Sequence, residues 1–353
     1  MRHFSSFIFL SFLSQISFAQ YSYENLVIEG GAIRGVAYTG ALQQLDSLCI
    51  LNKIQRVGGT SAGSIQAMLL AIGYKPNEVQ QIISDLKFYK FSDGHYLLGN
   101  GIFRLIKKFG WNEGREFYKF LEERISQKGL DPNITFEGFH QLVVKDSAYK
   151  ELYVVGTNLS KQRHEVFSYE TYPKMKIKDA VRISGSIPLF LKAIFMDKDG
   201  ITYKRYYKYL DLDVMVDGGL LANYPIFLFD STKYISPNTS SQNNMYAVNE
   251  KTIGLRLDNA EQIEYDKKGI RSLAPYDINV FKDYLAALFY ILLENTNRIA
   301  LTENDWRRTI SINTIGIKAN TKKLSQEQRL ALIESGKKAT DQFLNLKLTP
   351  EPK

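Results

Sequence analysis

A short apolar run that ends in a glycine turn and continues into a helical pattern occurs twice near the start of the chain. The first copy runs from residues 25–29 through Gly30-Gly31 into an apolar-periodic segment over residues 36–48. The second copy, over residues 54–72, has the same three parts in the same order. Strand, tight turn and helix in succession are typical of a parallel sheet that is covered by helices. The repeated pattern therefore predicts an α/β fold.

The rest of the chain extends this alternation. Apolar runs predict further strands at residues 152–157, 214–216, 253–257 and 309–312, and helical patterns cover residues 176–184, 277–298 and the segment that follows Ser325. Alternation of this kind favours a mostly parallel sheet. With 353 residues, of which 44% are hydrophobic, the chain can bury one large core. We expect a main domain over residues 20–260 and a C-terminal extension of helix and strand over residues 261–353, packed on the same domain.

Residues 1–19 have the pattern of a secretory signal peptide. A positively charged start is followed by an apolar stretch over residues 4–18 and by the small-residue site Ser17-Phe18-Ala19. A membrane anchor is the alternative, but a span needs about 20 apolar residues, and this shorter run is interrupted by Ser11 and Ser14. We expect cleavage after Ala19 and export, to the periplasm or out of the cell, with peripheral attachment to a membrane as a further expectation.

The charge balance favours anionic surfaces. Forty-five Lys and Arg residues against 37 Asp and Glu residues give a formal net charge of +8, which suits phospholipid headgroups. Because the basic residues are scattered and form no single stripe, we expect no nucleic-acid partner.

Cys49 is the only cysteine, so no internal disulfide can form. Its apolar neighbours Leu48, Ile50 and Leu51 predict a buried and inert thiol.

The second glycine turn contains a candidate nucleophile. Gly59-Thr60-Ser61-Ala62-Gly63 fits the pattern G-x-S-x-G, in which Gly59 and Gly63 permit a strained strand-to-helix turn that exposes the serine hydroxyl. At the start of the following helix, Ser61 also lies at the positive end of the helix dipole, which favours a developing alkoxide. An ordinary glycine turn is the alternative, and a partner base distinguishes the two.

The sequence favours an aspartate over a histidine as that base. The common hydrolase order is Ser, then an acidic residue, then His, but no histidine follows the late acidic residues. The four histidines are His3, His95, His140 and His164. Asp217 instead follows a predicted strand and precedes the turn Gly218-Gly219. An exposed aspartate, with a pKa of about 3.9, is a poor base near neutrality, so we expect the site to desolvate Asp217.

The first glycine turn is a candidate oxyanion site. Gly30, Gly31 and Ala32 present successive backbone N–H groups, which bind anions well. Arg34 either fixes this loop or offsets negative charge, and Gly35 allows close backbone approach. Nucleotide binding is disfavoured, because the glycines do not form G-x-G-x-x-G and the second turn lacks a P-loop lysine.

Metal chemistry and cofactors are not expected. Asp197 and Asp199 lie in a segment that ends in Gly200 and predicts a hairpin turn, and together with Asp211 and Asp213 they do not form an EF-hand pattern.

Taken together, these motifs resemble those of the patatin-like phospholipases. Gly30-Gly31-Ala32-Ile33-Arg34-Gly35, the serine motif and Asp217-Gly218-Gly219 occur in that family's order, and residues 180–188 and 223–225 also resemble its sequences. The resemblance covers residues 25–258. Ala32 is a departure, because the family often has a third glycine there, and the extra Cβ narrows the expected site.

The resemblance implies a three-layer α/β/α sandwich and a serine lipid acyl hydrolase without a cofactor, whose catalytic domain spans residues 20–260. It implies that Ser61 attacks an ester carbonyl, that Asp217 accepts the proton and later activates water, and that residues 30–32 hold the oxyanion. The substrate would be a phospholipid or other lipid ester. A soluble carboxylesterase or thioesterase and a latent, partner-dependent effector are alternatives, and the oligomeric state is open.

The helix expected over residues 277–298 is apolar nearly all round. This composition favours a core helix, with a surface that faces acyl chains or a membrane as the alternative.

Overall fold

The computed structural model describes residues 22–94, 105–106, 109–235, 245–270, 272–318 and 323–348. The expected signal peptide over residues 1–19 lies outside the described residues.

One mixed sheet organises the molecule. Its order is β11-β10-β1-β2-β4-β9-β7-β8, with β5 also paired to β4. The strands from β11 to β4 run parallel to their neighbours, and the remaining pairings are antiparallel. The bounds are β1 Asn25–Ile28, β2 Arg56–Thr60, β4 Glu151–Asn158, β5 Arg163–Phe167, β7 Ile194–Met196, β8 Thr202–Tyr203, β9 Asp213–Asp217, β10 Thr252–Asp258 and β11 Thr309–Asn313. A separate parallel pair joins β3 Gly110–Asn112 to β6 Leu189–Leu191.

Both faces of the sheet are buried. In β1, Leu26 and Ile28 join a large apolar cluster on one face, whereas Val27 joins a smaller cluster on the other. The first face is covered by α1 Val36–Ser47 and α2 Ala62–Ala71, among other helices. The second face is covered by short elements, including α8 Gly219–Ala222 and η4 Ile226–Phe229. The α/β fold with a mostly parallel central sheet between two layers is therefore confirmed.

The remaining helices complete these layers. They are η1 Ala32–Gly35, η2 Leu51–Lys53, α3 Pro76–Asp85, η3 Phe88–Phe91, α5 Arg115–Gln127, α6 Phe136–Lys145, α7 Ile177–Ser184, α9 Thr232–Ile235, α10 Ala260–Lys267, α11 Phe281–Arg298, α12 Glu303–Arg307 and α13 Gln326–Leu348. Among the helices in the described parts of the chain, none combines the length and apolarity that a bilayer span requires.

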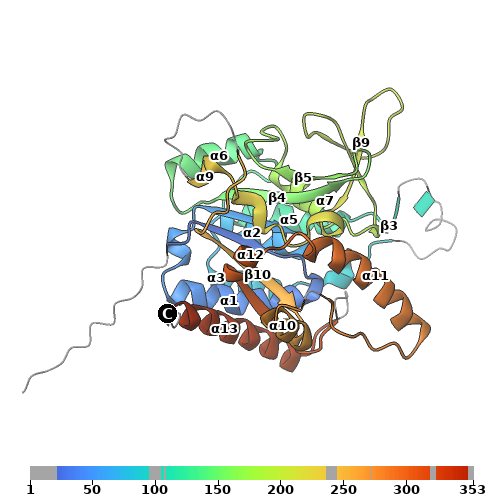
Figure 1. Cartoon of the computed structure of the whole chain (residues 1–353). Helices are drawn as coiled ribbons and strands as arrows, with labels where there is room; N and C mark the ends of the chain where they lie inside the picture. Colours follow the sequence, from blue (N-terminus) through green and yellow to red (C-terminus); the bar gives the residue numbers. More distant parts are fainter. Residues whose placement is uncertain are drawn as a thin grey trace, which may run out of the picture.

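The C-terminal segment contributes to the main sheet and to a helical layer. Strand β11 pairs with β10, and α13 lies along α1, as Figure 1 shows. The start of α13 has the expected capping box, in which the Ser325 N–H donates to the Gln328 side chain (3.0 Å) and the Gln328 N–H donates to Ser325 Oγ (3.2 Å). The two helices approach closely, because Gly40 of α1 lies against the backbone carbonyl of Ile333.

Strands β2 and β9 end at adjacent positions on β4. Thr60, the last residue of β2, lies opposite Val155, and Asp217, the last residue of β9, lies opposite Gly156. Strand β2 is parallel to β4 and β9 is antiparallel to it, so the two strands run toward one another. Their carboxyl ends therefore meet at one point of the sheet.

Two expectations about burial are wrong. Cys49 is exposed, because it follows α1 in a left-handed backbone conformation with φ of 58°, while its neighbours Ile50 and Leu51 turn inward. Helix α11 is not a core helix, since several of its large apolar side chains are exposed, with Phe281 at 74% and Leu292 at 67%.

Candidate active site

Ser61 occupies a strained turn between β2 and α2. Its backbone has φ of 51° and ψ of −123°, and α2 starts at the next residue. Gly59 and Gly63 make this turn possible, because a Cβ on Gly59 would meet the backbone of Gly63, and a Cβ on Gly63 would meet the carbonyl of Ile28. The N–H of Ser61 donates to Ser184 Oγ (2.8 Å). The turn thus has the geometry of a nucleophile elbow at a helix N-terminus.

Asp217 lies directly beside this serine. The Ser61 hydroxyl donates to Asp217 Oδ2 at 2.7 Å, and the Gly219 N–H donates to Asp217 Oδ1 at 2.8 Å. Asp217 is only 5% exposed. Loss of hydration raises the pKa of its carboxyl to about 7, although the hydrogen bonds from Gly219 and Ser61 act to lower it. A carboxylate in this position is a proton acceptor suited to neutral pH.

Gly218 and Ser186 fix the position of Asp217. A Cβ on Gly218 would meet the Val155 carbonyl of β4, so only glycine fits against the strand there. The N–H of Asp217 donates to the Ser186 carbonyl at 2.9 Å. Arg182 donates to Ser186 Oγ from a fully buried position.

The first glycine turn lies against the serine. A Cβ on Gly30 would fall 3.1 Å from Ser61 Cβ. The Gly30 N–H donates to the Asn223 carbonyl at 3.0 Å, so this donor already joins two loops. Ala32 has φ of 47°, a conformation that favours glycine. Arg34 is turned back toward the loop, because its Nε donates to the Gly31 carbonyl at 3.4 Å.

The other residues of this loop face the helix that carries the serine. The Gly35 carbonyl accepts a hydrogen bond from Gln66 Nε2 of α2 at 2.8 Å, and a Cβ on Gly35 would lie 3.6 Å from Ala62 Cβ. The glycine turn is therefore held against the helix that follows the serine by a side-chain-to-backbone hydrogen bond and by close packing.

Two asparagines connect the loops around Ser61. Asn223 Nδ2 donates to the Gly30 carbonyl at 3.1 Å, while its backbone N–H donates to Asn297 Oδ1 at 2.5 Å. Asn297 Nδ2 also donates to the Gly219 carbonyl at 3.3 Å. The motif at residues 223–225 drew attention to Asn223, but the sequence had no signal for Asn297 of α11, 74 residues farther along.

A buried ion network lies beneath the glycine turn. Glu29 contacts Arg256 at 3.3 Å, and Arg256 also contacts Asp258 (3.0 Å) and Glu294 (2.8 Å). Burial raises the pKa of Glu29 to about 7, although the Arg256 charge acts to lower it. Arg298 of α11 contacts Asp258 at 2.9 Å and extends the network. The network anchors α11 beneath the site.

Two cavities adjoin the site. The cavity at Ser61 measures about 30 Å³ and is lined almost wholly by apolar residues, which include Ile65, Phe88, Phe117, Ile187 and Phe190. A larger cavity of about 780 Å³ lies between α3, η3, α5 and the start of α13. Phe88 lines both cavities. Ala32 lines the cavity at Ser61, and the next residue, Ile33, lines the larger one, so the two cavities are close neighbours.

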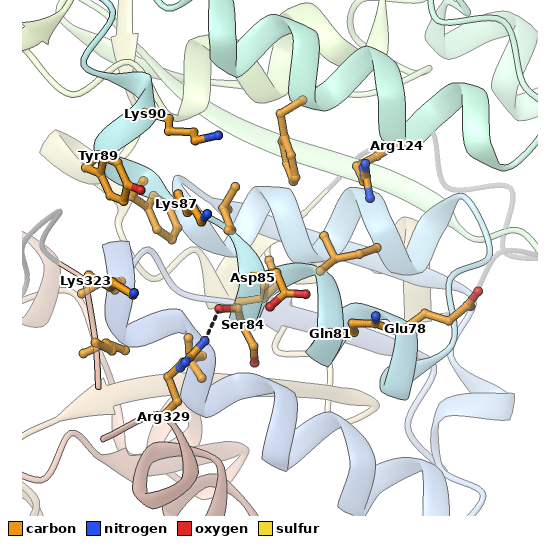
Figure 2. A pocket seen from close by; sticks show the side chains of 18 of the residues that line it. Glu78, Gln81, Ser84, Asp85, Lys87, Tyr89, Lys90, Arg124, Lys323 and Arg329 are labelled. Carbon is orange, nitrogen blue, oxygen red and sulfur yellow. Dashed lines mark hydrogen bonds between the residues drawn. The ribbon is translucent and has the colours of Figure 1, made fainter. Parts of the chain in front are cut away.

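The larger cavity has apolar walls and walls with charges of both signs, since the acidic Glu78 and Asp85 line it together with several basic residues. Figure 2 shows Lys87 and Lys90 on one side and Lys323 and Arg329 on another, with Arg329 donating to the Ser84 carbonyl at 2.9 Å. The apolar part of its lining includes Val36, Ile82, Leu86, Phe120 and Leu324.

The histidines and the aspartate turn lie apart from this pair. His140 Nδ1 of α6 is 2.5 Å from Glu151 of β4, His164 of β5 packs near Phe227, and His95 lies outside the described residues. The segment 197–200 is the expected hairpin turn between β7 and β8. Within the residues that the structure describes, no group of three or more His, Cys, Asp and Glu side chains is placed to hold a metal ion. That the protein uses no metal or cofactor stays a prediction.

Comparison with known proteins gives relatives that cover much of the chain. An uncharacterized protein of Acanthamoeba polyphaga mimivirus, R571, is 30% identical over 75% of this chain and 74% of its own length. A probable lipid hydrolase of Invertebrate iridescent virus 6, 463L, is 34% identical over 58% of this chain and 62% of its own length. The uncharacterized protein YqhO of Bacillus subtilis is 27% identical over 90% of this chain and 97% of its own length.

Solved structures share the fold. VipD from Legionella pneumophila superimposes with a TM-score of 0.54 at 16% identity, over 92% of this chain and 67% of VipD. ExoU in its heterodimeric complex with SpcU from Pseudomonas aeruginosa gives 0.50 at 16% identity, over 93% of this chain and 52% of that one.

A family model described as patatin-like phospholipase matches residues 26–230, the part that contains β1, the serine turn and Asp217. The chain therefore belongs to the patatin-like phospholipase family, a family of lipid hydrolases.

Proposed function

We propose that the chain is a lipid acyl hydrolase that cleaves fatty acyl esters through Ser61 and Asp217, with a phospholipid or lysophospholipid as substrate. The hydrogen bond of 2.7 Å from the Ser61 hydroxyl to a buried carboxyl with a pKa of about 7 carries this proposal. The family supplies the substrate class, and the pair supplies a nucleophile with its base.

The reaction proceeds in two halves. Ser61 Oγ bonds to the ester carbonyl carbon as its proton passes to Asp217, and the alcohol then leaves with that proton. Water attacks the acyl-serine in the second half, again giving its proton to Asp217, and the fatty acid is released as the proton returns to Ser61. We assign the oxyanion to the N–H groups of Gly31 and Ala32, because that of Gly30 is bonded to Asn223.

The acyl chain needs more room than the cavity at Ser61 offers. That cavity measures about 30 Å³, whereas the neighbouring one measures about 780 Å³, within the range of roughly 300–1,000 Å³ that is usual for ligand sites. We place the acyl chain past Phe88, against the apolar wall of the larger cavity that includes Ile82, Leu86 and Phe120. Phe88→Ala is then expected to raise the ratio of kcat/KM for long-chain over short-chain esters.

The test compares purified protein that begins at Gln20 with its Ser61→Ala and Asp217→Asn variants. Fatty acid release from vesicles of phosphatidylcholine and phosphatidylglycerol is measured beside fluorophosphonate labelling. Both variants are expected to lose at least about 1,000-fold in rate. Ser126→Ala and Asp146→Asn, at exposed positions, are the matched controls. Full activity in Ser61→Ala would disprove the assignment.

The same experiment separates the alternatives. Hydrolysis of dissolved short-chain esters or thioesters without release from vesicles identifies a carboxylesterase or thioesterase. Wild-type protein that neither labels nor hydrolyses identifies a latent effector that requires a partner.

Export is part of the proposal and rests on the pattern of residues 1–19. We expect the protein recovered from an expressing bacterium to begin at Gln20, outside the cytoplasm. Mass spectrometry of the N-terminus after fractionation tests this. An unprocessed N-terminus in the cytoplasmic fraction would contradict it.

A further inference from the structure

Helix α11 carries a row of exposed apolar side chains. The most exposed are Phe281 (74%), Leu292 (67%), Tyr284 (48%), Ile291 (48%) and Leu288 (44%). Their spacing places them along one side of the helix, which we call the outer face of α11. Figure 1 shows α11 extending outward from the sheet.

Three polar side chains near the end of α11, those of Glu294, Asn297 and Arg298, point inward instead. Glu294 contacts buried Arg256 at 2.8 Å, and Arg298 contacts Asp258 at 2.9 Å. Asn297 is 8% exposed and bonds to the loop that follows Asp217. A surface helix of a soluble protein ordinarily has the reverse arrangement, with its apolar side inward. An outer face of this kind indicates that something other than water covers it.

The outer face also adjoins the proposed active site. Helix α8, which starts two residues after Asp217, packs against α11, and its Leu221 is 38% exposed. The apolar surface therefore continues from α11 toward the loop that holds the base.

We propose that the outer face of α11 docks on the surface of a phospholipid bilayer, with the helix in the plane of the interface. The choice of a bilayer rests on the proposed function, because a lipid hydrolase must reach substrate that is packed in a membrane. Apolar and aromatic side chains on one side of a helix insert to the headgroup boundary. The formal net charge, +8 for the whole chain and +7 once Arg2 is removed with residues 1–19, adds attraction to anionic lipids. Docking in this orientation places the Asp217 loop, through α8, next to the lipid.

The test measures binding to sedimented vesicles of phosphatidylcholine and phosphatidylglycerol. Ser61→Ala protein serves as the parent, so that substrate turnover does not alter the vesicles. The double variant Leu288→Glu/Leu292→Glu is expected to bind at least about tenfold more weakly, because it places two negative charges where two apolar side chains would be buried in the bilayer. The matched control is Val144→Glu/Leu330→Glu, which changes two exposed apolar residues on α6 and α13. The vesicle affinity of this control is expected to stay within about twofold of that of the parent.

Folding and activity are checked separately. With Ser61 intact, the α11 double variant is expected to keep its thermal transition and its rate on a dissolved short-chain ester, and to lose about tenfold or more on vesicles. If the wild-type protein binds vesicles through α11 but hydrolyses no ester, the docking surface is supported and the proposed function is overturned. If the double variant hydrolyses vesicle lipid as fast as wild type, the docking surface is overturned and the proposed function is not.

Two other results would overturn the proposal. Equal vesicle binding by the parent and the α11 double variant would show that another surface binds lipid. A concentration-dependent dimer of the parent that the double variant converts to a monomer, with no change in vesicle binding, would show that a second copy of the chain covers α11.

Discussion

The carboxyl of Asp217 is buried and has one hydroxyl and one backbone N–H as hydrogen-bond donors. Its pKa of about 7 makes the charge of this residue sensitive to pH near neutrality. Only the ionised form accepts the proton of Ser61. We therefore expect kcat/KM on a dissolved ester to fall about tenfold per pH unit below about pH 7 and to level off above it. A profile that is flat from pH 5 to pH 9 would contradict Asp217 as the base.

The same shift predicts a stability effect of opposite sign. The pKa of Asp217 is higher in the folded protein than the value of about 3.9 in an unfolded chain. Its contribution to folding is thus complete below about pH 4 and is lost as pH rises to about 7. At pH 8, Asp217→Asn is expected to raise the free energy of unfolding by about 2–4 kcal/mol. Denaturant unfolding at pH 4 and pH 8 measures this, with Asp146→Asn as the control that should change neither value.

Ala32 is the residue at which the chain departs from the family's glycine. Its φ of 47° disfavours a side chain, and a left-handed conformation costs about 1–2 kcal/mol for a residue other than glycine. Ala32→Gly is expected to raise the free energy of unfolding by about 1 kcal/mol and to keep esterase activity. Thermal and denaturant unfolding check the first result. A destabilised variant would show that the Ala32 methyl group has favourable packing.

At the scale of elements, α11 connects the C-terminal segment to the proposed site. Asn297→Ala removes two hydrogen bonds to the loop after Asp217, and an unpaired buried polar group costs about 1–3 kcal/mol. We expect kcat on a dissolved ester to fall about ten- to a hundredfold, with vesicle binding unchanged. Asn295→Ala, an exposed position on the same helix, is the control. Equal rates for both variants would rule out a positioning role for Asn297.

The local pattern of apolar and polar residues predicted most helices and strands. It failed where contacts between distant segments determine the end of a strand or the buried side of a helix. The strand at residues 152–157, the helix at 176–184 and the capping box at Ser325 were all predicted. The prediction of β2 at 54–57 ended too early, because Gly58 and Gly59 pair with β4 through backbone groups alone. Helix α11 was misread as core, since a helix that is apolar nearly all round does not reveal which side its few charged residues turn toward.

The proposed site was only partly predictable, for a similar reason. Ser61 and Asp217 have local motifs, and the structure brings them together. Ser184, which receives the Ser61 N–H, lies 123 residues away and has no motif of its own beyond the segment 180–188. Arg256 and Asn297 become neighbours of the site only through sheet order and helix packing.

At the scale of the whole molecule, the close contact between α1 and α13 joins segments that are far apart in the sequence. Gly40 lies against the Ile333 carbonyl, with no room for a Cβ. Gly40→Ala is expected to lower the free energy of unfolding by about 2 kcal/mol or more, even though alanine favours helices. Gly138→Ala in α6, where the nearest atoms lie 3.5 Å from the added Cβ, is expected to be neutral or stabilising. Equal effects in urea unfolding would mean that α13 does not pack on α1 as described.

The meeting of β2 and β9 on β4 has a mechanical consequence. Thr60 pairs with Val155 and Asp217 pairs with Gly156, two neighbouring residues of β4. The ends of β2 and β9 are therefore both attached to the same short segment of β4. When thermal motion twists or bends the sheet, that segment carries both ends with it as a common displacement. We therefore expect bending or twisting of the whole sheet to change the distance of 2.7 Å between Ser61 Oγ and Asp217 Oδ2 very little.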